Sequence, residues 1–136
     1  MKLYAQLNFG GNCEDAFRYY EAHLGGKITM MMHQGDVPSP GQNPAANPSA
    51  ILHARINIGE TELLGNDVPP EIFKPMRSTY LLLSFDSSEE AERVHAVLSD
   101  GGDVLMAMGE NFFAFRFSML RDQFGVLWTI IHQRPM

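Results

Sequence analysis

Apolar, β-prone segments recur through the first half of the chain. Residues 3–9 and 27–33 each predict a strand, and residues 50–67 predict two strands joined by a turn at Gly59-Glu60. Between the first two strands, apolar side chains recur at the spacing of one helix face, at Ala16, Phe17, Tyr20 and Leu24. Asn12 stands where a helix cap is needed. The predicted order of elements is β-α-β-β-β.

The second half of the chain predicts the same order of elements. A helical stripe begins after the turn and cap residues 86–88. Strands are predicted on both sides of it, at residues 79–85, 103–108, 112–119 and 127–132. The last two of these strands are joined by a turn in the segment RDQFG.

A shift of 76 residues relates the two halves. It places Gly25-Gly26 on Gly101-Gly102, and it brings the apolar positions of the first two strands onto their counterparts. The sequence therefore predicts a duplicated module, because each half is too small to bury a good core alone. We expect module 1 at residues 1–68, a proline-rich linker at 69–77 and module 2 at 78–136. Two such modules side by side can enclose a cleft between curved sheets.

The composition narrows the classes of function. A formal charge of −6 argues against a nucleic-acid partner, which needs clustered Lys and Arg. No apolar run approaches the length of a membrane span, and the first residues lack the pattern of a signal peptide. A single cysteine excludes an internal disulfide framework. We expect a folded, cytoplasmic protein with neither a membrane nor a nucleic-acid partner.

Residues 35–49 are rich in proline, glycine and amide side chains, which predicts a long surface loop. It has almost no apolar anchor apart from Val37. Such a loop is suited to lie over the mouth of a binding cleft.

Four segments carry a resemblance to a known family: LNFGGNCEDAFRYYEAHLGGKI, the GDVP of the following loop, HARINIGETELLGND and GENFFAFRFSMLRDQFGVLW. They resemble the PhnB-like branch of the vicinal oxygen chelate superfamily, which contains glyoxalases, bleomycin-resistance proteins and extradiol dioxygenases. The resemblance covers nearly the whole chain. It implies an α+β fold, in which two βαβββ modules form curved mixed sheets around a cleft. It also implies a homodimer.

Metal-dependent members of this superfamily hold a divalent ion with His and Glu side chains from the first and last strand of each module. Aligned without gaps, those four positions fall on Ala5, Leu63, Tyr80 and Thr129. None of them is a usual metal ligand, and a one-residue error adds only Glu62 as a strong one. The sequence thus predicts no metal and no other cofactor, and it argues against lyase, isomerase and dioxygenase activity.

PhnB-like proteins have often carried the label 3-demethylubiquinone-9 3-methyltransferase. No glycine-rich loop follows a strand here in the way that would hold a methyl donor in a Rossmann-like domain. The sequence gives no support for methyl transfer.

Glu110 and His53 are the candidates for acid–base chemistry. Glu110 lies beside aromatic residues in the segment GENFF, and a carboxyl next to apolar rings can act as an acid or base. The alternative is a solvated turn residue. His53 lies in a strand, where it is either a general acid or base or an ordinary strand histidine. Cys13 is either a reactive thiol at a helix start or a small packing residue.

Methionine and aromatic residues on the strands predict either core packing or an apolar ligand site. We expect Tyr80 and Phe113 to form apolar walls, with Glu110 or Arg116 as a polar contact. Arg116 is otherwise an exposed strand residue. Two functions follow as alternatives. The first is metal-free binding of a small apolar or aromatic molecule between the modules. The second is an enzyme that uses Glu110, His53 or a weakly bound metal.

Overall fold

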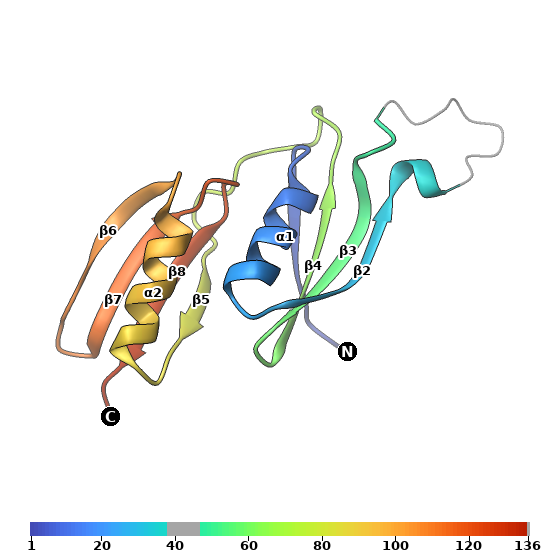
Figure 1. The fold of residues 1–136 in the computed structure, drawn as a ribbon. Helices are drawn as coiled ribbons and strands as arrows, with labels where there is room; N and C mark the ends of the chain where they lie inside the picture. The colour runs from blue at the N-terminus through green and yellow to red at the C-terminus, as the bar shows by residue number, and fades with distance from the viewer. Residues whose placement is uncertain (38–46, 136) are drawn as a thin grey trace. The chain divides into compact units, whose positions relative to one another are not determined.

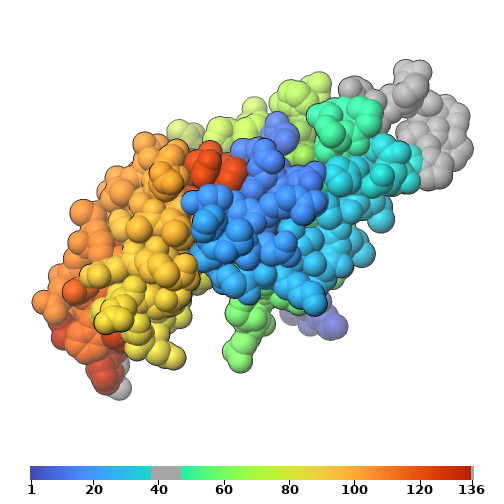
Figure 2. Space-filling model, in the orientation of Figure 1, coloured from blue at the N-terminus to red at the C-terminus, as the bar shows by residue number. Residues whose placement is uncertain are grey.

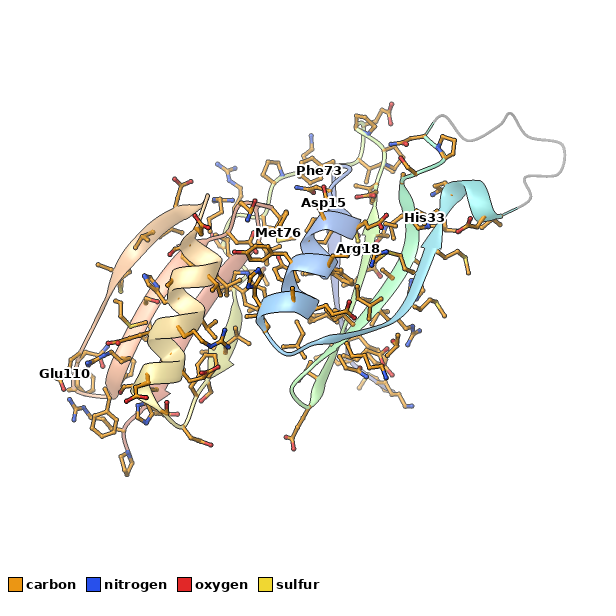
Figure 3. The ribbon with its side chains drawn as sticks, in the orientation of Figure 1. Asp15, Arg18, His33, Phe73, Met76 and Glu110 are labelled. Carbon is orange, nitrogen blue, oxygen red and sulfur yellow. The ribbon has the colours of Figure 1, made fainter. Side chains whose placement is uncertain are left out.

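A computed structural model describes residues 1–37 and 47–135. The chain divides into two compact units, Met1–Lys74 and Pro75–Met136, and their boundary falls inside the segment 69–77 that the sequence marks as a linker. Each side of this boundary is tied to its own unit (Figure 3). The Phe73 ring lies against Gly10, where an added Cβ would be 3.1 Å from the ring. The Met76 carbonyl accepts a hydrogen bond of 3.0 Å from Arg121.

The first unit is one mixed four-stranded sheet with a helix (Figure 1). The strand order is β1-β4-β3-β2, with β1 parallel to β4 and the other neighbours antiparallel. In chain order the elements are β1 (Ala5–Phe9), α1 (Cys13–His23), β2 (Lys27–His33), the short 3-10 helix η1 (Gln34–Asp36), β3 (Ile51–Ile58) and β4 (Thr61–Asp67). Residues 38–46 of the predicted surface loop lie outside the described residues, so its role as a cover stays a prediction.

The second unit repeats this topology with the strand order β5-β8-β7-β6, in which β5 is parallel to β8. Its elements are β5 (Leu81–Ser84), α2 (Ser88–Ser99), β6 (Asp103–Gly109), β7 (Ala114–Arg121) and β8 (Leu127–Gln133). The predicted βαβββ order is thereby confirmed in both halves, and so is the α+β class with two modules. The predicted strand 79–85 is shorter in the structure, where the strand begins only at Leu81.

The core of the first unit lies between α1 and its sheet. Ala16, Phe17 and Tyr20 of the predicted helix stripe are fully inaccessible, whereas Leu24 is the C-cap of α1 and is half-buried. Gly65 on β4 makes this close approach possible, because a Cβ there would lie 2.6 Å from Phe17 Cζ. In Figure 2 the side chains of α1, in blue, form the surface over this part of the unit. The helix therefore covers one face of its sheet.

The start of α1 is held by a residue that the sequence did not suggest. Asn12 occupies the cap position but makes no side-chain capping bond, so the expectation that it caps the helix is wrong. Asp67 at the end of β4 does this instead, since its Oδ1 accepts hydrogen bonds from the backbone N–H groups of Gly11 and Cys13, both at 3.0 Å. Its Oδ2 accepts another from Ile51 N at 2.8 Å. A carboxylate suits both the unpaired N–H groups and the positive helix end.

Candidate functional site

Each sheet has one face covered by its helix and one helix-free face. In the first unit the helix side is marked by Gly65, which faces Phe17, and by Ala54, its partner on β3. Because side chains alternate along a strand, the neighbours of these residues point to the helix-free face. The strand pairing brings them together in a row across all four strands, made of Gln6, Leu64, Arg55 and Met30.

The helix-free face of the first sheet is mainly polar, and its polar groups are hydrogen-bonded to one another. Gln6 Nε2 donates to Asn8 Oδ1 and to Asn66 Oδ1, both at 3.0 Å. Its apolar members are Leu64 and two exposed methionines of β2, Met30 and Met32. The expectation of apolar walls from the Met-rich strand therefore holds only for part of this surface.

Arg55 is the centre of a second polar group on the same face. Its Nε donates to His53 Nε2 at 3.1 Å, and its Nη1 is paired with Glu62. Arginine is always a donor, so His53 Nε2 must be the unprotonated nitrogen of a neutral ring in this arrangement. The candidate base His53 is thus engaged with a cation on one of its two nitrogens.

The helix-free face of the second sheet is apolar. Ser118 on β7 is bonded to His95 of α2 at 2.8 Å, so Ser118 faces the helix and its neighbours Phe117 and Met119 face away. The strand pairing again gives a row across all four strands, made of Leu82, Thr129, Met119 and Met106. Leu82 is 58% exposed and Met106 50% exposed, whereas Thr129 on the interior strand β8 is buried, so the accessible apolar surface of this row lies on its two edge strands.

The four predicted ligand-binding residues lie in separate parts of the second unit. Tyr80 precedes β5, the edge strand that runs parallel to β8 from the pair Leu81–Trp128. Glu110 and Phe113 lie between β6 and β7, next to the opposite end of β8, where Ala114 is paired with Gln133. Tyr80 and the Glu110–Phe113 loop are therefore at opposite corners of the sheet.

Glu110 lies in water beside a guanidinium group and not in an apolar enclosure (Figure 3). Its side chain is 62% exposed and pairs with Arg134 at 2.8 Å. Arg134 also lies over the ring of Phe115, 4.5 Å from its centroid. This is the solvated turn residue that the sequence left as the alternative, and an acid–base role for Glu110 stays a prediction.

Arg116 points toward α2, away from the apolar row. It shares the helix side with Ser118, and its Nε is bonded to Glu92 of α2 at 2.7 Å. Cys13 is fully buried, and burial raises the pKa of its thiol to about 12, with smaller contributions from Asp67 and Glu14. This is the packing residue of the two alternatives, because the thiolate is the reactive form.

The helix α1 and strand β2 are joined by an ion-pair network on the helix side. Glu14 accepts hydrogen bonds from Arg18 and from His33, both at 2.8 Å (Figure 3). The bond to Glu14 raises the pKa of His33, and Asp36 adds to this effect. The bond to His33 lowers the pKa of Glu14, as does Arg18. In this network the charged forms of Glu14 and His33 stabilise each other. The network lies at the protein surface on the helix side, away from the helix-free face.

Two pockets lie at the ends of the units. One of about 530 Å³, in the first unit, is lined by Gly10, Gly11, Gln34, Asn47, Ala50, Asp67, Val68, Pro69, Pro70 and Glu71. The other, of about 420 Å³, is lined by residues 84–86 and 132–135 of the second unit. Neither is lined by a predicted site residue. Asp67 is the buried carboxylate of the first pocket, and both of its oxygens are already bonded to the backbone.

The donor set does not fit the divalent metal that the fold family implies. Two of the four aligned positions, Leu63 and its partner Ala5, lie on the helix side with Gly65 and not on the helix-free face. On the helix-free face, the ligand-type groups of His53 and Glu62 are both bonded to Arg55, so a metal would have to displace a cation. Within residues 1–37 and 47–135, no group of three or more His, Cys, Asp or Glu side chains is placed to hold a metal.

These two sheets, each built as β-α-β-β-β, define the class of the protein. A glyoxylase/bleomycin resistance protein/dioxygenase domain from Frankia sp. EAN1pec shares the fold with a TM-score of 0.67 and 13% identity, over 98% of both chains. The fold is that of the vicinal oxygen chelate superfamily, as the sequence indicated.

The family follows from closer matches. A family model described as 3-demethylubiquinone-9 3-methyltransferase matches residues 1–131, and the chain belongs to this PhnB-like family. Protein YjdN of Escherichia coli is 33% identical over 145 residues, covering 99% of both chains. The crystal structure of protein PA1353 from Pseudomonas aeruginosa has a TM-score of 0.89 and 35% identity, again over 99% of both chains.

Among the described residues, no helix is long and apolar enough to cross a membrane.

The main residue that sequence reasoning missed is Arg55. A signal was available, since the predicted turn at Gly59-Glu60 sets the register of β3 against β4. That register pairs Asn57 with Glu62 and so places Glu62 diagonally next to Arg55 on one face.

Proposed function

We propose that the protein binds a small apolar or aromatic molecule without a resident metal. The observation that carries this proposal is the apolar row on the helix-free face of the second sheet, Leu82, Thr129, Met119 and Met106. Phe117 lies on the same face, and Tyr80 is two residues before Leu82 on the same chain edge. Leu82 and Met106 are half-exposed apolar side chains on the two edge strands of this face, and exposed apolar surface of this kind favours a role in contact.

The size of this surface sets the expected affinity. Covering about 200 Å² of apolar area contributes about 5 kcal/mol before the costs of association. A ligand held by this surface alone should therefore bind with a Kd of about 0.2 mM or weaker. Methionine and aromatic side chains adapt to varied shapes, so we expect tolerance among flat apolar ligands.

A binding screen with a matched pair of variants tests the proposal. Met106 and Val104 lie on the same strand and are both 50% exposed, but Met106 is on the helix-free face whereas Val104 is paired with Leu120 on the helix side. We expect neutral aromatic and apolar compounds to raise the melting temperature of the native protein. Met106→Gln should weaken these hits about tenfold and Val104→Gln should not. A screen without hits, or hits that respond equally to both variants, would refute the proposed surface.

We also propose that the protein is a homodimer in the cytoplasm, as the family resemblance implies. The two sheets have exposed edge strands, and β6 carries the half-exposed residues Val104, Leu105 and Met106. Edge strands of this kind need cover. Light scattering at micromolar concentration tests this, and a mass near that of one chain would contradict it.

A further inference from the structure

Arg55 lies in the middle of the first sheet, on the helix-free face. Its strand β3 is an interior strand, and its direct neighbours in the row are the apolar side chains of Leu64 and Met30. The side chain is 37% exposed, so the guanidinium group is accessible without being fully solvated. An arginine at the edge of a sheet is free to turn into water, but this one is confined between two apolar neighbours.

Two partners fix the orientation of this guanidinium group. His53 accepts from Nε, and Glu62 is paired with Nη1. These contacts engage two of the three guanidinium nitrogens, and within the described residues Nη2 has no partner. A fork held in this way presents its remaining N–H groups in a set direction, which lowers the entropy lost on binding.

The neighbouring amides add donors to the same face. The side-chain oxygens of Asn8 and Asn66 both accept a hydrogen bond from Gln6 Nε2. The amide nitrogens of Asn8 and Asn66 have no partner among the described residues. The helix-free face thus offers donors more than acceptors, and this favours an oxyanion over a metal ion.

We propose that Arg55 binds the oxyanion group of a small organic anion, a carboxylate or a phosphonate, through Nη2. Arg55 thereby supplies the positive charge that a divalent ion supplies in metal-dependent members of the superfamily. His53 and Glu62 act as positioning residues for the guanidinium group. The chain as a whole carries a charge of −6, so binding of an anion depends on this local cation and not on long-range attraction. This site is on the first unit and does not depend on the apolar surface of the second.

Titration of the protein with matched probes tests the site. The probes are benzoate and phenylphosphonate as anions, neutral benzamide of similar size, and inorganic phosphate. NMR follows the Arg55 Nε–H signal, and calorimetry gives the affinity. We expect saturable binding of both organic anions, at least tenfold tighter than benzamide. Equal binding of inorganic phosphate and phenylphosphonate would show that the organic part is not recognised, which would overturn the assignment to an organic anion.

The variants separate this site from an unspecific charge effect. Arg55→Met should weaken anion binding at least tenfold, whereas Arg18→Met, which removes an arginine paired with Glu14 on α1, should leave it unchanged. Glu62→Gln keeps an acceptor oxygen for Nη1, so the fork stays oriented, but it removes the competing negative charge. It should therefore tighten anion binding severalfold, a gain that lost folding cannot imitate. Unchanged or weaker binding in Glu62→Gln, or equal effects of the two arginine variants, would overturn the proposal. If the screen with neutral aromatic compounds described above gave no hits, the expected effects of these variants on anion binding would stay the same.

Discussion

Replacement of Asp67 gives the sharpest test of how the first unit is held together. The carboxylate is 9% exposed and accepts three backbone N–H groups, those of Gly11, Cys13 and Ile51. Asp67→Ala leaves all three donors without their acceptor. Asp67→Asn keeps one acceptor oxygen but turns an amide N–H₂ group toward one side of the cluster, where it opposes an N–H donor.

The magnitude follows from which donors water can reach. The bonds from Cys13 and Ile51 are buried, whereas the bond from Gly11 is only partly buried and can be replaced by water. A buried donor without a partner costs about 1–3 kcal/mol, so two of them give about 4 kcal/mol for Asp67→Ala. Asp67→Asn should cost about 2 kcal/mol. Against a typical free energy of unfolding of about 5–15 kcal/mol, the alanine variant should retain about 1–11 kcal/mol and unfold at a clearly lower urea concentration.

Urea unfolding followed by far-UV circular dichroism measures both values. Trp128, the single tryptophan of the chain, lies buried in the second unit and gives a separate fluorescence signal. Coincidence of the two transitions would show that the units unfold together. Asp15→Asn, an exposed acid in the same helix turn, is the control and should change stability by less than about 0.5 kcal/mol. If Asp67→Ala matched this control, the account of Asp67 as the holder of α1 would be refuted.

Three further outcomes are expected. Gly65→Ala should destabilise by about 1–3 kcal/mol in urea melts, because its Cβ collides with a buried ring. Gly109→Ala should not, because its Cβ makes only an ordinary contact of 3.8 Å with the Ala107 carbonyl, and equal values would contradict the packing. The ion pair of His33 with Glu14 should stabilise the fold most at pH values above the lowered pKa of Glu14 and below the raised pKa of His33, and this contribution should fade on either side. A difference in melting temperature between wild type and His33→Gln that does not change with pH would refute this. Cys13 should resist iodoacetamide in mass spectra at pH 8 until urea is added, and rapid native labelling would contradict its burial.

The order of the elements could be read from the sequence, because apolar periodicity and paired glycines are local signals. Strand β2 begins and ends at the predicted residues 27 and 33. The cap of α1 could not be read in this way. Asp67 lies more than fifty positions from the N–H groups of Gly11 and Cys13, and the parallel pairing of β1 with β4 brings it there. Asn12 is a residue type typical of helix caps, but the tertiary contact of Asp67 provides the capping bonds instead.

The candidate site shows the same division between local and distant information. Alternation shows that Arg116 and Phe117 lie on opposite faces, but the bonds of Arg116 to Glu92 and of Ser118 to His95 are needed to show which face belongs to α2. Glu110 meets Arg134 from 24 positions away, which turns an expected apolar setting into a surface ion pair. The polar character of the first sheet's helix-free face could have been predicted from the sequence, because the register of β3 against β4 follows from the predicted turn at Gly59-Glu60.

The two helices also differ in when their ends can form during synthesis. Ser87 accepts from Glu90 N only three positions away, so α2 can be capped as soon as it is made. The start of α1 must wait for Asp67, 54 positions after Cys13. At about 5–20 residues per second, the ribosome needs roughly 3–11 s to supply that partner. An isolated helix of this length is marginal in water. The start of α1 is therefore completed seconds after the helix residues are made, whereas the start of α2 can form as soon as its own residues are made.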